Sequence, residues 1–185
     1  MPSSVWRRGP SRVSASDLSP AAMRFHHMAI FVTDIQKAMG LWRDVLGFRV
    51  ITDRMIPDGP APGPGVYMYP ALLDDIFKVE DARSNMVLLI SDEGAIIELQ
   101  QCENPPIQAT PRAHLRYGHS GFHELGLLVT DIDDWFLKIR AAGYETQTEY
   151  VWPCAGIGRS FLFYDDDGNM IQLWEHNRED SPNDR

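Results

Sequence analysis

HHMAIFVTDIQKAMGLWRDVLGFRV (residues 26–50) and FHELGLLVTDIDDWFLKIRAAGYET (residues 122–146) are two versions of one pattern. Each begins with a short apolar run, continues through V-T-D-I into apolar residues at helical spacing, and ends in glycine followed by an aromatic residue. This order predicts a strand followed by a helix. The chain is therefore expected to contain an internal repeat, with one copy in each half.

Both predicted helices have signals at their ends. Asp34 and Asp131 are placed to cap the first turns, and Gly47 and Gly143 are placed to end the helices in a left-handed conformation. The apolar stripes predict the side of each helix that packs into the core. They consist of Ile35, Ala38, Leu41, Trp42 and Val45 in the first helix, and Ile132, Trp135, Phe136 and Ile139 in the second.

Three further strands are expected after each helix, at 48–55, 84–91 and 94–100 in the first half and at 144–152, 159–165 and 168–174 in the second. The first half also has an insertion with a Pro/Gly-rich loop and the short helix ALLDDIFKV. The expected organisation is a disordered tail at 1–23, a first module at 24–103 with its insertion at 56–83, a linker at 104–119, a second module at 120–176 and a disordered tail at 177–185.

Composition excludes several classes of function. The 185 residues are 44% hydrophobic and 23% charged, as in an ordinary soluble globular protein. A net charge of -9 argues against nucleic acid as a partner, and no apolar run approaches the roughly 18 to 20 residues that span a bilayer. With only Cys102 and Cys154, a disulfide framework is not expected, and the predicted compartment is the cytoplasm.

Strand parity predicts which side chains face away from the helices. Side chains alternate along a strand, so His27 and Phe31 share one face while Ile30 and Val32 pack on the helix. In the second copy the same parity turns Glu124 away from the helix and His123 towards it. A bulge at the start of this strand would exchange the two, so His123 remains an alternative.

The closing strands place a glutamate and a glutamine in equivalent positions. Glu98 is the fifth residue of GAIIELQ, and Gln172 is the fifth residue of GNMIQLW. A carboxylate in an apolar strand needs a metal, another cation or a proton. The alternative is a salt bridge from Glu98 to Arg159 or Arg112, or partial exposure.

The segments HMAIFVTDIQKAMGLWRDVLGF, GAIIEL, LGLLVTDIDDWFLKIRAAGYE and FLFYDDDGNMIQLWE resemble the vicinal oxygen chelate superfamily, which includes glyoxalases, bleomycin-resistance proteins and extradiol dioxygenases. The resemblance covers nearly all of residues 24–176. It implies an α+β fold in which two βαβββ modules form an open, curled β-barrel with the helices outside. It also implies a site in the concave face, metal ligands from the first and last strands of each module, and a homodimer.

Transferring the ligand positions gives His27, Glu98, Glu124 and Gln172 around a divalent ion (Mn, Mg, Fe, Ni or Zn). The commonest pattern of the family has histidine where Glu124 stands and glutamate where Gln172 stands. This set suits a Lewis acid that polarises a carbonyl while a carboxylate, Glu98 or Glu124, moves a proton. The predicted function is isomerase, epimerase or lyase chemistry on a small carbonyl-containing substrate.

Two other functions remain open. If His123 faces the site, then His27, His123 and Glu98 form the ligand set of a non-haem Fe(II) oxygenase, and extradiol-type ring cleavage is the alternative. Without a metal, the concave face would bind and sequester a small molecule such as a drug. The expected pocket residues are Phe31, Leu128, Met170 and Trp174.

Overall fold

The structure is a computed structural model that describes residues 25–177. The N-terminal tail predicted at 1–23 lies outside the described residues, and so does the C-terminal tail predicted at 177–185, apart from Asn177. Within the described part of the chain, no helix is long and apolar enough to cross a membrane.

The two modules have the predicted order of elements. The first consists of β1 (His27–Phe31), α1 (Ile35–Met39), the π-helical segment η2 (Gly40–Val45), β2 (Arg49–Ile56), α2 (Pro70–Phe77), β3 (Arg83–Ile90) and β4 (Ile96–Asn104). The linker contains a 3-10 turn, η3 (Arg112–Leu115). The second module consists of β5 (Glu124–Leu128), α3 (Ile132–Ala141), β6 (Trp152–Cys154), β7 (Gly158–Tyr164) and β8 (Met170–His176).

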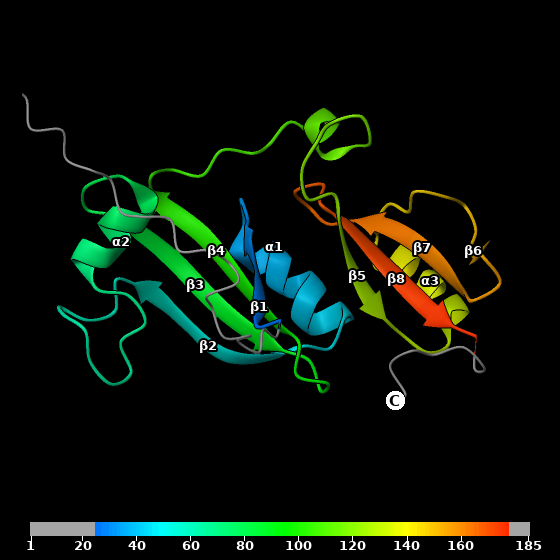
Figure 1. Cartoon of the computed structure of the whole chain (residues 1–185), viewed down its shortest axis with the longest axis horizontal. Helices are drawn as coiled ribbons and strands as arrows, with labels where there is room; N and C mark the ends of the chain where they lie inside the picture. Colours follow the sequence, from blue (N-terminus) through cyan, green and yellow to red (C-terminus); the bar gives the residue numbers. More distant parts are fainter. Residues whose placement is uncertain (1–24, 178–185) are drawn as a thin grey trace, which may run out of the picture.

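Each module forms one open four-stranded sheet. The strand orders are β1-β4-β3-β2 and β5-β8-β7-β6, with the first pair parallel and the other pairs antiparallel. Figure 1 shows the two sheets side by side, with α3 behind β7 and β8. The predicted α+β fold, with two βαβββ modules in an open curled barrel and helices outside, is confirmed.

One apolar core joins the helices to the sheets. Its fully buried residues include Trp42 from η2, Leu99 from β4, Ile139 from α3 and Phe161 from β7, so the core is continuous between the two modules. The helical stripes predicted from the sequence all contribute to it. Since the core lies on the helix side of both sheets, the opposite faces are left for a site; we call these the site faces.

The start of α1 forms as expected. The Asp34 carboxylate accepts hydrogen bonds from the backbone N–H groups of Gln36 and Lys37, and Gly47 adopts a φ of +82° after the helical segment. In addition, the Gln101 side-chain oxygen accepts a hydrogen bond from the Ile35 N–H over 2.9 Å. The helix is therefore capped both from its own N-terminus and from β4.

The expectation that Asp131 caps α3 is wrong. Asp131 has a φ of +58° and its side chain makes no capping hydrogen bond. Instead, the Glu175 carboxylate on β8 accepts a hydrogen bond from the Ile132 N–H over 3.1 Å. Glu175 occupies the repeat position of Gln101, so in both modules the last strand provides an acceptor for the first N–H of the helix.

The strand predicted at 144–152 is also wrong for most of its length. Only Thr146 forms an isolated bridge, to Phe163, and β6 begins at Trp152. The Thr148 hydroxyl donates to the carbonyl oxygen of Tyr150 over 2.6 Å. Local hydrogen bonds of this kind compete with the ladder bonds of a sheet, which explains why this polar segment forms turns.

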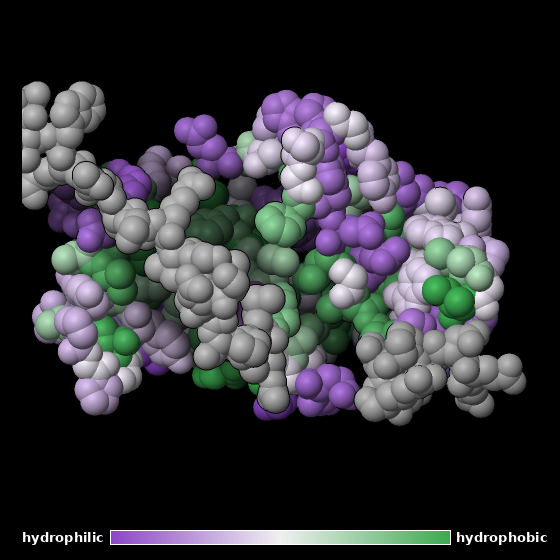
Figure 2. All heavy atoms as spheres, viewed as in Figure 1, coloured by the Kyte–Doolittle hydropathy of each residue, from purple (hydrophilic) through white to green (hydrophobic). Residues whose placement is uncertain are grey.

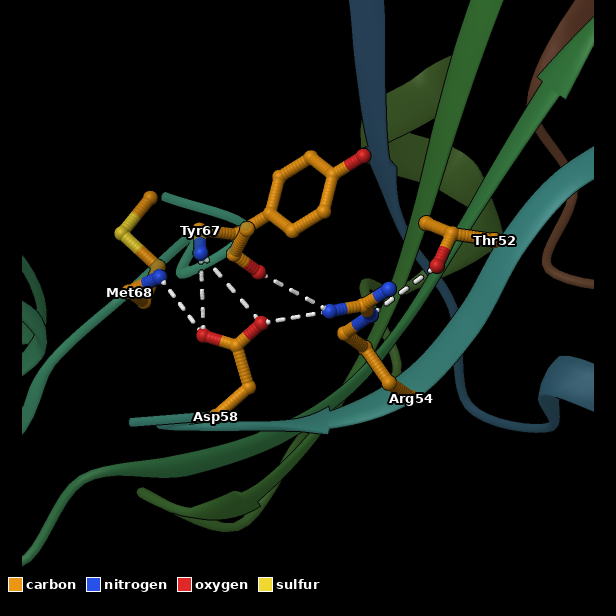
Figure 3. A network of polar contacts seen from close by, with 6 residues as sticks. Thr52, Arg54, Asp58, Tyr67 and Met68 are labelled. Carbon is orange, nitrogen blue, oxygen red and sulfur yellow. Dashed lines mark hydrogen bonds and ion pairs between the residues drawn. The ribbon is translucent and has the colours of Figure 1, made fainter. Parts of the chain in front are cut away.

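The insertion folds onto the site face of the first sheet. Helix α2 packs through Leu73 and Phe77 in an apolar cluster with Met86 of β3 and Ile56 of β2. Arg54 of β2 anchors the Pro/Gly-rich loop, because its guanidinium donates to Asp58 over 2.9 Å and lies over the Tyr67 ring. Figure 3 shows this network. The insertion is therefore a fixed wall of the first site face.

The Asp58 carboxylate is central to this anchor. It accepts hydrogen bonds from the backbone N–H groups of Tyr67 and Met68 in addition to the ion pair with Arg54, and its side chain is 7% exposed. Although burial alone raises its pKa, the Met68 N–H, the Arg54 guanidinium and the Tyr67 N–H together hold the pKa of Asp58 below its ordinary value.

The linker is held against the second module by arginines. The Arg116 guanidinium lies 3.7 Å from the centroid of the Tyr164 ring and donates to the carbonyl oxygen of Gly168 over 3.0 Å. The β7–β8 turn also contacts the first module, since Asp167 accepts hydrogen bonds from the Thr33 hydroxyl and N–H. These contacts fix the linker and the relative placement of the two modules.

Candidate functional site

His27 and Glu98 lie together on the site face of the first module. β1 and β4 are parallel neighbours, and Ala29 pairs with Glu98 in the register. The His27 Nε2 atom lies 3.6 Å from the Glu98 Oε2 atom, with side-chain exposures of 38% and 15%. An imidazole nitrogen and a nearly buried carboxylate oxygen therefore face one another.

Two neighbouring side chains orient this pair. The Gln100 amide donates to the Glu98 Oε1 atom over 2.5 Å, which leaves Oε2 directed at His27. On the other side, the Nδ1 atoms of His26 and His27 lie 2.7 Å apart, so one of the two rings donates to the other. If His27 is the donor, its Nε2 lone pair is free to accept a proton or to bind a metal.

Gln100 also has an unsatisfied atom. The residue is 5% exposed, and its Oε1 atom is buried with no hydrogen-bond partner among residues 25–177. A buried amide oxygen without a donor costs free energy of the order of 1–3 kcal/mol. The Oε1 atom therefore lies next to the Glu98 carboxylate with its hydrogen-bonding capacity unused among residues 25–177.

No arginine among the described residues pairs with Glu98. Arg159 instead donates to Glu175 and Asp133, each over 2.9 Å, and Arg112 lies 3.7 Å from Glu145. His27 is the only ion-pair partner of Glu98 within the part of the chain that the structure describes. The salt bridges to Arg159 or Arg112 considered from the sequence do not form.

The second module presents Glu124 and Gln172 on its own site face. β5 begins at Glu124, and Gly126 pairs with Gln172 on the neighbouring strand β8. The Tyr117 hydroxyl donates to the Glu124 Oε2 atom over 3.3 Å. Burial first, and then the Glu124 charge, raises the pKa of Tyr117, so the phenol remains a donor at neutral pH.

His123 precedes β5 and contacts the linker. Its Nε2 atom makes a short contact with the carbonyl oxygen of His119, and its ring stacks on Tyr117 with centroids 6.0 Å apart. Its Nδ1 atom is buried and has no partner within the described residues. The ring thus contacts the linker backbone and, among the described residues, does not join His27 and Glu98 in a group that could hold a metal ion.

Within the described residues, the two modules do not gather His27, Glu98 and Glu124 into one possible metal-binding group. Within residues 25–177, no three His, Cys, Asp or Glu side chains gather in a way that could hold a metal ion. His27 and Glu98 are therefore treated as one candidate half-site, and Glu124 and Gln172 as another. We call these the first and second half-sites.

The expected pocket residues differ in exposure. Phe31 and Leu128 are 46% and 54% exposed on the site faces, whereas Met170 is 2% exposed and packs with Leu162 and Tyr164. The Trp174 indole N–H donates to His176 over 3.2 Å. In the view of Figure 2, apolar (green) residues are visible near the centre, beside hydrophilic (purple) ones.

Sequence reasoning overlooked two residues of these half-sites. Gln100 lies two positions after Glu98, so parity alone places it on the same face, but nothing in the sequence showed that it would bond Glu98. Tyr117 lies in the linker, seven positions before Glu124, and only the folded linker brings them together.

A model of the Glyoxalase/Bleomycin resistance protein/Dioxygenase superfamily matches residues 24–173. A comparison with curated proteins finds no match. Among solved structures, a glyoxalase family protein from Bacillus cereus is similar with a TM-score of 0.69 and 17% identity, covering 86% of this chain and 98% of that one.

Two other similar structures have more specific descriptions. A point mutant of the fosfomycin resistance protein FosX from Listeria monocytogenes, complexed with Mn(II) and dihydroxypropylphosphonic acid, has a TM-score of 0.55 and 15% identity, covering 86% of this chain and 95% of that one. TnmS3, an antibiotic binding protein from Streptomyces sp. CB03234, has a TM-score of 0.51 and 17% identity, covering 86% and 100%. At these identities the likeness shows the fold alone. Because the family model spans both modules, the chain belongs to the Glyoxalase/Bleomycin resistance protein/Dioxygenase superfamily.

Proposed function

We propose that the protein is a divalent-metal-dependent enzyme that acts on a small carbonyl-containing substrate by isomerase, epimerase or lyase chemistry. The observation that carries this proposal is the environment of Glu98. Its carboxylate is 15% exposed, has an imidazole nitrogen 3.6 Å away, and has no arginine or lysine partner within the described residues. Such a group needs a cation, and a divalent metal is the one that the donor set fits.

The four proposed ligands are His27, Glu98, Glu124 and Gln172, which offer one nitrogen and three oxygens. This set suits Mn²⁺, Mg²⁺, Fe²⁺ or Ni²⁺ better than a thiolate-preferring ion, although Zn²⁺ also accepts such ligands. A bound ion would supply Lewis acidity at a substrate carbonyl. Gln100 supports the fit, because its amide holds Glu98 with one oxygen directed towards His27.

Proton transfer is assigned to a carboxylate of the site. A base that removes a proton next to a carbonyl must reach the substrate, and Glu124 is exposed on its site face. The Tyr117 hydroxyl holds one of its oxygens, and the other, which would bind the ion, would act as the base once released from it. Tyr117 is therefore proposed to position Glu124, and Glu98 is the second candidate for the same proton transfer.

A homodimer is part of this proposal. One chain contains both half-sites, but within its described residues they are not joined. If two copies associate so that the first half-site of one faces the second half-site of the other, each dimer has two complete sites related by symmetry. FosX supports the assignment of a metal, because that protein of similar fold is complexed with Mn(II).

Small-molecule binding without catalysis is the second candidate. The aromatic and apolar character of the site faces, with Phe31 and Leu128 about half exposed, favours it, and TnmS3 is an antibiotic binding protein of similar fold. This function requires no metal. The extradiol alternative is less well supported, because the His123 Nε2 atom contacts the linker carbonyl of His119.

Exchange of substrate hydrogen with solvent tests the proposed chemistry. The protein with added Mn²⁺ is incubated in D₂O with a panel of small 2-hydroxy and 2-oxo carbonyl compounds, and loss of the C–H signal next to the carbonyl is followed by proton NMR. We expect metal-dependent exchange that is lost in Glu98→Gln. The matched control is Glu103→Gln, on the same strand but the opposite face, where the carboxylate is 53% exposed beside Arg83.

Exchange that persists in Glu98→Gln contradicts the proposed role of this residue. Tight binding of a panel member without metal and without exchange supports the binding function instead. Oxygen consumption on catechols with Fe²⁺, lost in His123→Ala, supports the dioxygenase.

A further inference from the structure

An apolar pocket lies at the far end of the first site face. It has a volume of about 280 Å³, and its walls come from β1, α2, β4 and the start of the linker. The residues around it are Phe31, Phe77, Cys102 and the linker residues 105–108. None of them is charged, and burial raises the pKa of the Cys102 thiol, which keeps it neutral.

The pocket walls are fixed by contacts that surround them. The Phe31 and Phe77 rings lie 6.0 Å apart, and Leu73 of α2 is buried in the apolar cluster with Ile56 and Met86. The Asn104 amide donates to the carbonyl oxygens of Glu80 and Asp81, over 2.8 and 2.9 Å. The insertion and the start of the linker are therefore tied together, and the pocket is part of the folded structure.

The same strands carry the pocket and the first half-site. Glu98, Gln100 and Cys102 alternate along β4 and share one face, so the pocket floor lies about 13 Å from Glu98 at a rise of about 3.3 Å per residue. Gln100 lies between them, with its buried Oε1 atom unpartnered among the described residues. A ligand that extends along this strip passes a metal-binding end, an unsatisfied hydrogen-bond acceptor and an apolar end in turn.

We infer that the substrate is an elongated molecule with a chelating carbonyl or oxyanion head at the first half-site and an aryl or similarly bulky apolar group in this pocket. This inference rests on the proposed function, because it assigns the head group to the metal. The pocket is open to solvent on one side, and its volume of about 280 Å³ leaves room for an aromatic ring, since an enclosed apolar cavity of about 150 Å³ holds a benzene molecule. Specificity then comes from the insertion and the linker.

Two hydroxamic acids test the inference, because a hydroxamate chelates metals and its tail can be varied. Binding of acetohydroxamate and of 4-phenylbutanohydroxamate to the Mn²⁺-loaded full-length protein is measured by isothermal titration calorimetry. Burial of the phenyl group is expected to give the longer compound an affinity advantage of about 30-fold. Ile107→Asp places a charge in the pocket wall. We expect it to bring the ratio of the two affinities close to one.

The matched control is Leu137→Asp, on the exposed side of α3 with 65% exposure, and it is expected to keep the wild-type ratio. Equal affinities of the two hydroxamates for the wild type would contradict binding of the phenyl group in this pocket. An unchanged ratio of the two affinities in Ile107→Asp would contradict it as well. A head-free probe, 4-phenylbutanamide, separates the two proposals. If neither hydroxamate binds but the amide binds to the wild type and not to Ile107→Asp, the proposed metal site is contradicted and the proposed ligand pocket is supported. If none of the three binds, both fail.

Discussion

Two substitutions in different modules test whether two chains share each metal site. Glu98→Gln removes a charge from the first half-site, and Glu124→Ala removes one from the second. In a dimer with shared sites, each variant alone has both sites damaged. A mixed dimer contains one chain of each variant, so one of its sites carries both substitutions and the other carries neither. We therefore expect the mixed dimer to bind about half as much metal as the wild-type dimer.

The homodimer of each variant alone gives the lowest metal content expected in this experiment. Substitution of a residue that only hydrogen-bonds to a metal ligand weakens metal affinity about 10- to 100-fold. Loss of a carboxylate that itself binds the metal should weaken the affinity more than that. The two variants are co-expressed with different tags, the mixed dimer is isolated in two affinity steps, and its metal is measured by mass spectrometry. A mixed dimer without metal refutes the shared site, as does a wild-type monomer that holds one metal ion.

Three further changes test the structure around the half-sites. Asp34→Ala removes the cap of α1 and is expected to lower the free energy of unfolding by about 1 kcal/mol in urea titrations, whereas Asp131→Asn, which loses no cap, should leave it nearly unchanged. Asp58→Asn leaves Arg54 without its anion and is expected to cost about 1–3 kcal/mol at neutral pH. The folded pKa of Asp58 is below its unfolded value of about 3.9. The difference in free energy of unfolding between the wild type and Asp58→Asn should therefore have its full size above that pH and shrink as the pH falls through the folded pKa. A difference that stays constant from pH 7 to pH 2 contradicts the role of the Asp58 charge. Gly158→Ala places a Cβ atom against the Glu175 carbonyl oxygen and 2.9 Å from the Trp174 ring. It is expected to destabilise the protein by about 1–3 kcal/mol and to change its tryptophan fluorescence; an unchanged spectrum and midpoint argue against this close packing.

The fold was predictable because its signals are local and occur twice. The V-T-D-I motif marks the strand-to-helix transition in each module, and the buried stripes appear where the 3.6-residue spacing places them. Period-two alternation was enough to put His27 and Glu98 on one face, because both lie inside regular strands paired in parallel. Asp34 caps its helix as a local rule predicts.

The parts that failed depend on residues distant in sequence. Asp131 has the same local sequence as Asp34, but Glu175 from β8 takes the first N–H of α3, and no local rule includes that residue. The alternation in TQTEYVW is typical of a strand, yet side-chain hydrogen bonds such as that of Thr148 turn the chain away from the sheet. The apolar pocket was not predicted either, because it forms only when α2 and the linker fold over β1 and β4.

The metal content of protein purified without added metal tests the central claim most directly. The wild type, His27→Ala, Glu98→Gln and the control Glu103→Gln are prepared in parallel and measured by elemental mass spectrometry together with their thermal unfolding. Our account predicts about one divalent ion per chain in the wild type and in Glu103→Gln, and little or none in the other two at unchanged fold. Equal metal content in all four proteins, or none in a folded wild type that also fails to bind added Mn²⁺, would contradict it.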